Sequence, residues 1–173
     1  MSLRKAFMMF WLGGLVVFIL AIGLGLAIVA DGGPGILDHQ SAGTAKAVNA
    51  IHAAWETVGQ TSLAKAAMMA DLVFIGLFGL GSVLGGWYYW RTGSGAVAVF
   101  GMLALCAALL FIATDYAETG AQFIQLMRDR GGDRLAGLAA TMQPIKQAAF
   151  VFMFAGIIAA FALRRVLDGP ALD

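Results

Sequence analysis

Charged side chains are scarce in this sequence. Lys, Arg, Asp and Glu make up 12% of its 173 residues, whereas hydrophobic residues make up 61%. Because a soluble domain averages about a quarter charged residues, these charges are too few to cover a water-facing surface, and we expect lipid to cover much of the exterior. The net charge of +1 gives no electrostatic reason to expect nucleic acid as a partner.

Cysteine and histidine are also rare. The one cysteine, Cys106, cannot form an intrachain disulfide, which excludes a redox relay of the two-cysteine kind. Its apolar neighbours predict a small packing residue. The two histidines, His39 and His52, lie outside the long apolar runs of the chain. We therefore expect no haem held by two histidines inside a helix bundle, and we predict no cofactor.

Four apolar runs are each longer than the roughly 20 residues that a helix needs to cross the hydrocarbon of a bilayer. They cover residues 7–30, 63–90, 96–127 and 135–163. We interpret the first run as a retained anchor, because the apolar part of a signal peptide is only about 7–15 residues long. The pattern predicts an all-α integral membrane protein, an up-down bundle of four transmembrane helices that forms a single domain over residues 1–173.

The segment between the first two runs has a different pattern. Three glycines and a proline at residues 32–35 break any helix there. Apolar residues then recur at helical spacing, at Val48, Ile51, Trp55 and Val58. This spacing predicts an amphipathic helix over residues 43–58 that lies on the membrane surface or over the end of the bundle.

The basic residues indicate an orientation. Arg4 and Lys5 precede the first run, whereas Asp31 and Asp38 follow it. Because cytoplasmic segments carry an excess of Lys and Arg, we expect a cytoplasmic N-terminus. Four crossings then place the C-terminus on the same side. Apart from Lys146, the basic residues of the chain divide equally between the two sides, so the first run alone decides.

Ionisable residues inside the apolar runs are the best indicators of function in such a chain, because an uncompensated charge in lipid is costly. Four are present, Asp71, Asp115, Glu118 and Lys146. Counting about 20 residues along each run from its cytoplasmic end places all four within about 5 Å of one level, near the outer face. Gln143 lies one turn before Lys146 and is grouped with it.

This polar layer has three interpretations. Asp115 and Lys146 form a structural ion pair between the third and fourth crossings, or the layer binds a small ligand or ion, or the side chains are simply solvated. Three carboxylates against one amine leave an excess of negative charge. We therefore expect one carboxylate to be protonated or to hold a cation.

A metal site would need His52. If the amphipathic helix folds back over the bundle, His52 could join Asp71, Asp115 and Glu118, and these residue types suit zinc. No HxxxH or HExxH spacing is present, however, so His52 is a weak candidate and we predict no metal. His39 lies in a glycine-rich segment, where we expect it to be solvated.

The chain resembles a loose group of small bacterial membrane proteins with four crossings and no assigned activity. In that group an Asp-x-x-Phe begins the second crossing, as Asp71 to Phe74 does here. An Asp-x-x-Glu-Asn ends the third, where this chain has Asp115 to Glu118 followed by Thr119 in place of Asn, and a Lys lies early in the fourth, here Lys146. The resemblance implies a shared fold and polar layer, and a multi-pass protein of the bacterial inner membrane.

Three functions follow from these patterns. The first is a non-enzymatic membrane protein whose polar layer binds a small ligand or ion. The alternative is an accessory subunit of a larger membrane complex, or a homo-oligomer, docked through glycine-rich faces of the first two crossings at Gly13, Gly14, Gly23, Gly25, Gly76 and Gly79. The third is a metal-dependent intramembrane hydrolase that uses His52. The lipid bilayer is the expected partner in every case.

Overall fold

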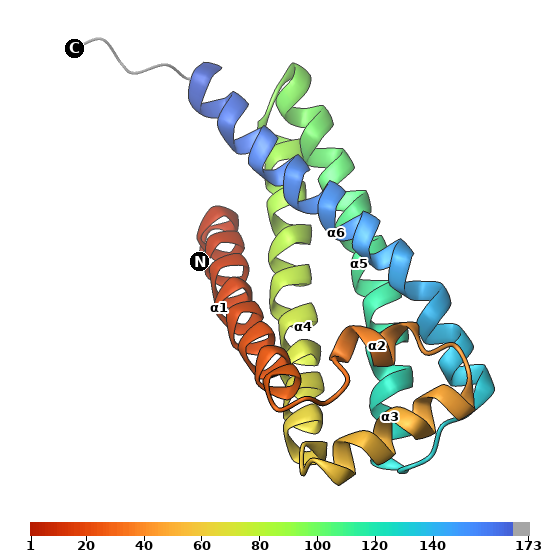
Figure 1. Cartoon of the computed structure of the whole chain (residues 1–173). Coiled ribbons are helices and arrows are strands. Elements are labelled where there is room, and N and C mark those ends of the chain that lie inside the picture. Colours follow the sequence, from red (N-terminus) through yellow and green to blue (C-terminus); the bar gives the residue numbers. More distant parts are fainter. Residues whose placement is uncertain (168–173) are drawn as a thin grey trace.

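Six helices make up the computed structural model shown in Figure 1, which describes residues 1–167. They are α1 (Leu3–Ala30), α2 (Ile36–Ser41), α3 (Ala45–Thr57), α4 (Thr61–Thr92), α5 (Gly95–Met127) and α6 (Asp133–Leu167). No strand occurs among the described residues, which confirms the all-α prediction. The four helices α1, α4, α5 and α6 are long and apolar enough to cross a membrane. Each of them contains one of the four predicted apolar runs.

Local sequence sets where the long helices begin and end. The Ser2 side chain accepts a hydrogen bond from the backbone N–H of Lys5 and so caps α1. After α1, Gly32 has a φ of 81°, a left-handed conformation that suits glycine. Gly95 has a φ of 51° at the start of α5, directly after the end of α4. The short connection makes α4 and α5 antiparallel neighbours.

The long helices pack in chain order, α1 on α4, α4 on α5 and α5 on α6. Aromatic rings fill the space between them. The Trp11 ring of α1 stacks on Phe78 of α4 and on Phe154 of α6, with centroids 5.5 Å apart in both pairs. Phe18 of α1 contacts Phe74 of α4 at 4.8 Å. This cluster holds the N-terminal half of α1 against the rest of the bundle.

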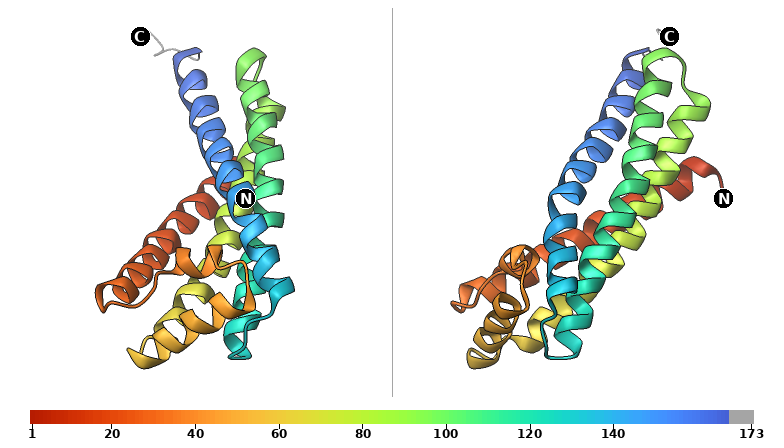
Figure 2. Two further views of the ribbon diagram at one scale, coloured as in Figure 1. Left: turned by 45° about the vertical axis from the view of Figure 1, so that its right-hand side comes forward. Right: turned by 90° about the vertical axis from the view of Figure 1, so that its right-hand side faces the viewer.

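The C-terminal half of α1 diverges from α6, as the two views in Figure 2 show. The Phe18 and Phe150 rings, 5.9 Å apart, are among the last contacts between α1 and α6 in this direction. Beyond them, α1 continues along α4 and away from α6. The opening between α1 and α6 is therefore created by the tilt of α1.

The two short helices lie across the end of the bundle where α1 ends and α4 begins (Figure 1). The helix α3 lies within the predicted range 43–58 and covers the bundle end. It is tied to the α5–α6 connection by hydrogen bonds from Ala45 N–H to Asp133 and from Gly131 N–H to Asn49, 2.7 and 2.6 Å long. The helix α2 was not predicted, because it has only six residues, directly after the glycine-rich break, and is too short to show a helical pattern of apolar residues. We call α2 and α3 together the cap.

Two expectations about small residues need correction. Cys106 is exposed on the outer side of α5 and is not a packing residue. Gly14 and Gly79, taken as docking positions for a partner, instead pack inside the chain: a Cβ on Gly14 would meet Phe78, and one on Gly79 would meet Ile112. A Cβ on Gly13, in contrast, would have no neighbour within 4 Å among the described residues.

These two adjacent glycines give a test of the α1–α4 packing. A Cβ on Gly14 would lie 2.6 Å from the Cα atom of Phe78, so Gly14→Ala forces the two helices apart. We expect this substitution to lower the free energy of unfolding in detergent by about 1–3 kcal/mol. Gly13→Ala is the matched control and should leave stability unchanged or slightly raised, because alanine is the better helix former. Equal melting temperatures for the two variants would contradict the packing described here.

Candidate functional site

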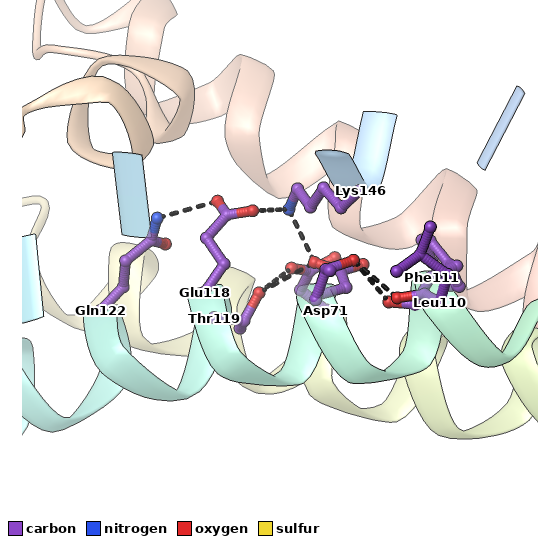
Figure 3. Close-up of polar contacts among 9 residues, drawn as sticks. Asp71, Leu110, Phe111, Glu118, Thr119, Gln122 and Lys146 are labelled. Carbon is purple, nitrogen blue, oxygen red and sulfur yellow. Dashed lines mark hydrogen bonds and ion pairs between the residues drawn. The ribbon is translucent and has the colours of Figure 1, made fainter. Parts of the chain in front are cut away.

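One amine and two carboxylates meet between α5 and α6. The Nζ atom of Lys146 lies 2.7 Å from Oδ1 of Asp115 and 2.8 Å from Oε2 of Glu118. Asp115 is 2% exposed and Glu118 is fully buried. Figure 3 shows Lys146 reaching from α6 toward the side chains of α5. The ion pair that the sequence predicted between Asp115 and Lys146 is thus present in the fold, with Glu118 as a second partner of the amine.

The carboxylate of Asp71 joins this group through a hydroxyl. Thr119 Oγ1 donates a hydrogen bond to Asp71 Oδ2 at 2.9 Å and lies 3.3 Å from Asp115 Oδ1. A hydroxyl has a single proton and can donate to only one of the two at a time. Within residues 1–167, Asp71 has no ion pair of its own. We call Asp71, Asp115, Glu118, Thr119 and Lys146 the polar cluster.

Helical spacing explains why α5 supplies most of the polar cluster. Glu118 and Thr119 follow Asp115 by three and four residues, and Gln122 follows them by four and three, so all four side chains share one face. Gln122 extends the contacts, because its Nε2 atom donates to Glu118 Oε1 at 3.0 Å. Thr119 and Gln122 were not among the predicted site residues, although their spacing from Asp115 is a usable signal.

Gln143 does not belong to the polar cluster. It is half-buried on α6 and makes no polar contact with any residue that the structure describes. Pro144 lies next to it inside α6 and removes one backbone donor from the helix. The structure therefore brings together four of the five predicted ligand-binding candidates, namely Asp71, Asp115, Glu118 and Lys146.

A cavity of about 660 Å³ lies beside the polar cluster, in the opening between α1 and α6. We call it the lateral cavity. Its walls are mostly apolar and include Phe18, Ile22, Met68, Phe74, Phe150 and Val151. Asp71, Asp115 and Lys146 line its inner end, and residues of α2 line the side nearest the cap. A volume of this size is in the range of pockets that hold small organic ligands.

The two histidines meet inside the cap. His39 Nε2 lies 3.0 Å from His52 Nε2, and the two residues are 1% and 5% exposed. The expectation that His39 is solvated is wrong, because α2 folds over the bundle end and buries it beside Trp55. His52 does not join the carboxylates of the polar cluster. Instead its Nδ1 atom lies 4.0 Å from Asp129. Among residues 1–167, no three His, Cys, Asp or Glu side chains are grouped as a metal site would need.

Burial keeps this histidine pair neutral near pH 7. The pKa of His39 falls to about 4, mainly through desolvation and also through the neighbouring His52, while Gln122 acts in the opposite direction. Desolvation also lowers the pKa of His52, with Asp129 raising it and Lys65 lowering it. In a contact between two imidazole nitrogens, one must donate and the other accept. Protonation of both rings would leave the contact without an acceptor.

Comparisons of the chain with protein families, with curated proteins and with solved structures give no match. The function must therefore be inferred from the geometry of the polar cluster and of the lateral cavity.

Removing the amine tests how much the polar cluster depends on it. Lys146→Met leaves two buried carboxylates without their cation, and breaking a buried ion pair in this way costs about 3–5 kcal/mol. We expect a loss of that size in the free energy of unfolding in detergent. Lys46→Met, at an exposed position of α3, is the control and should be near neutral. Adding Asp115→Asn and Glu118→Gln to Lys146→Met should recover part of the loss. Wild-type stability in Lys146→Met would contradict this account.

The histidine pair predicts a pH dependence of stability. Because the pKa of His39 is about 4 in the fold, below its ordinary value of 6.5, the unfolded chain binds more protons between these two pH values. This contribution to stability is complete above pH 6.5 and is lost as the pH falls toward 4, by at most about 3 kcal/mol. His39→Phe should reduce the slope of melting temperature against pH in this window, whereas Glu56→Gln, an exposed change on α3, should not. An identical slope in His39→Phe would refute the assignment.

Proposed function

We propose that this chain is a non-enzymatic multi-pass membrane protein that binds a small, positively charged ligand or ion at the polar cluster. One observation carries the proposal. Asp115 and Glu118 pair with the amine of Lys146, and the carboxylate of Asp71 adds a third negative charge where the polar cluster lines the lateral cavity, so the site has more carboxylates than amines next to space for a ligand. A cation that enters the cavity would offset this charge in surroundings where electrostatic attraction is strong.

The exposed surface of the long helices supports membrane insertion. Large apolar side chains project from them, with Val16 of α1 68% exposed and Phe152 of α6 70% exposed. In water such a surface would be unfavourable, and in lipid it is the ordinary one. We place both termini in the cytoplasm of a bacterial cell and the polar cluster near the outer face of the inner membrane. The orientation rests on Arg4 and Lys5, and the assignment to a bacterial inner membrane rests on the resemblance described above.

A purely structural ion pair would explain Asp115 and Lys146 but leaves two features without a purpose. Asp71 adds a negative charge that no cation of the described residues pairs with. The lateral cavity brings that charge into contact with the outside of the bundle. A site built only for stability would gain from fewer carboxylates and from closer packing. Ligand binding accounts for both features.

A role as an accessory subunit is the second candidate. It is favoured by α1, which packs chiefly on α4 and has much of its remaining surface exposed. Of the glycines assigned to docking, Gly13, Gly23 and Gly25 have open space beside them. Gly14, Gly76 and Gly79 are covered by other parts of the chain. The hydrolase is not proposed further, because His52 lies in the cap and not with the carboxylates.

The thermal stability of the purified protein tests cation binding. Methylammonium chloride, exchanged for sodium chloride at constant ionic strength, should raise the melting temperature of the wild type by roughly 2–4 °C at concentrations above its Kd. Asp115→Asn removes a charge at the centre of the polar cluster and should abolish the rise. Glu56→Gln removes an exposed charge of the cap and should keep it. The same rise in Asp115→Asn as in the wild type would remove the proposal.

A further inference from the structure

The lateral cavity combines two kinds of surface. Its mouth lies between α1 and α6 and is bordered by apolar residues that project outward, such as Leu26, 65% exposed, and Val151, 61% exposed. Aromatic rings of Phe18, Phe74 and Phe150 line its depth. Its polar lining residues lie at the inner end, at the polar cluster, on the side formed by α2, and at Gln147 of α6. A ligand that covers the whole cavity must therefore have an apolar part and a charged part.

The charge at the inner end decides the sign of the charged part. Lys146 lines the cavity but already contacts two carboxylates, at 2.7 and 2.8 Å. An anion placed there would face Asp71 and Asp115 without a free cation to offset it. Asp71, in contrast, lines the cavity, is half-buried and accepts one hydrogen bond, from Thr119. A primary ammonium group has three donors and matches a carboxylate that lacks a cation.

We propose that the lateral cavity binds an amphiphile with a hydrocarbon chain and a primary amine head group, the amine on Asp71 and the chain between α1 and α6. The proposal rests on the proposed function and names the class of its ligand. An amphiphile of this kind enters sideways from the bilayer, because the mouth of the cavity lies on the exposed flank of the long helices. Its hydrocarbon chain moves from the lipid to the apolar walls between α1 and α6. Its amine moves from the bilayer surface to the carboxylate of Asp71, with which it forms an ion pair.

Three twelve-carbon amphiphiles with different head groups test the ligand class. Dodecylamine, dodecanol and dodecanoate are added separately, at equal mole fraction, to the wild-type protein in dodecyl maltoside micelles, and the melting temperature is measured. Dodecylamine should raise it by roughly 3–6 °C, and dodecanol and dodecanoate should not. An equal or larger rise with dodecanoate or dodecanol would overturn the proposal.

The contribution of the chain is tested with a short amine. Methylammonium at the same concentration should produce less than half of the rise seen with dodecylamine, because it leaves the apolar part of the cavity empty. An equal rise would overturn the amphiphile while leaving cation binding intact. If neither amine shifts the melting temperature, the proposed function fails with it. The two failures are therefore distinguishable.

Two variant pairs locate the ligand. Asp71→Asn should abolish the dodecylamine rise, and Glu56→Gln should keep it. Gly25 lines the cavity and Gly23 does not, and a Cβ on either has no neighbour within 4 Å among the described residues. Gly25→Leu should therefore fold, and its apparent affinity for dodecylamine, taken from the melting-temperature rise at increasing dodecylamine, should be at least tenfold lower than that of the wild type. Gly23→Leu should have the affinity of the wild type. Equal affinity in Gly25→Leu and Gly23→Leu would overturn the placement of the chain.

Discussion

The contact of the Lys146 amine with the carboxylates of Asp115 and Glu118 is the constraint on which the arrangement of α5 and α6 depends. All three side chains are buried among apolar helices, where a charge without a partner costs several kcal/mol. Any rotation of α5 or α6 that separated these side chains would leave buried charges without partners. The contact therefore sets which face of α5 looks inward. Once that face is set, Thr119 and Gln122 lie inside as well. The hydrogen bond of Gln122 to Glu118 then follows from helical spacing, whereas that of Thr119 to Asp71 also needs the packing of α5 against α4.

The position of α1 obeys a different constraint. It has no charged contact with the polar cluster, and it is held by aromatic rings and by close approach at glycine, where Gly14 meets the backbone of Phe78. Such contacts concentrate in its N-terminal half, so its C-terminal half is free to diverge from α6. The lateral cavity is the space that this divergence leaves. The ion pair joins α5 to α6 behind the cavity, and the apolar packing of α1 leaves the cavity open between α1 and α6.

Much of this could be predicted from the sequence. The lengths of the apolar runs locate α1, α4, α5 and α6, and counting from their ends places four ionisable residues near one level. The tilt of α1 could not be predicted, because it depends on which glycine meets which residue of α4. The burial of His39 was missed because the contact partner, His52, lies in another helix of the cap, and no local pattern links the two. Cys106 shows a further limit: apolar neighbours surround it in the chain whether its side of α5 faces the core or the outside.

The histidines of the cap are neutral near pH 7 and add no positive charge near the polar cluster. Gln122 lies between the two groups, since it donates to Glu118 and acts on His39. If His39 carried a proton at neutral pH, it would supply a positive charge close to the polar cluster. Burial instead lowers the pKa of His39 to about 4, so it does not. Of the described residues in contact with the polar cluster, Lys146 alone then provides a positive charge. The rest of the compensation for three carboxylates has to come from a proton or from a cation outside the chain, and under the proposed function such a cation would reach Asp71 through the lateral cavity, which Asp71 lines.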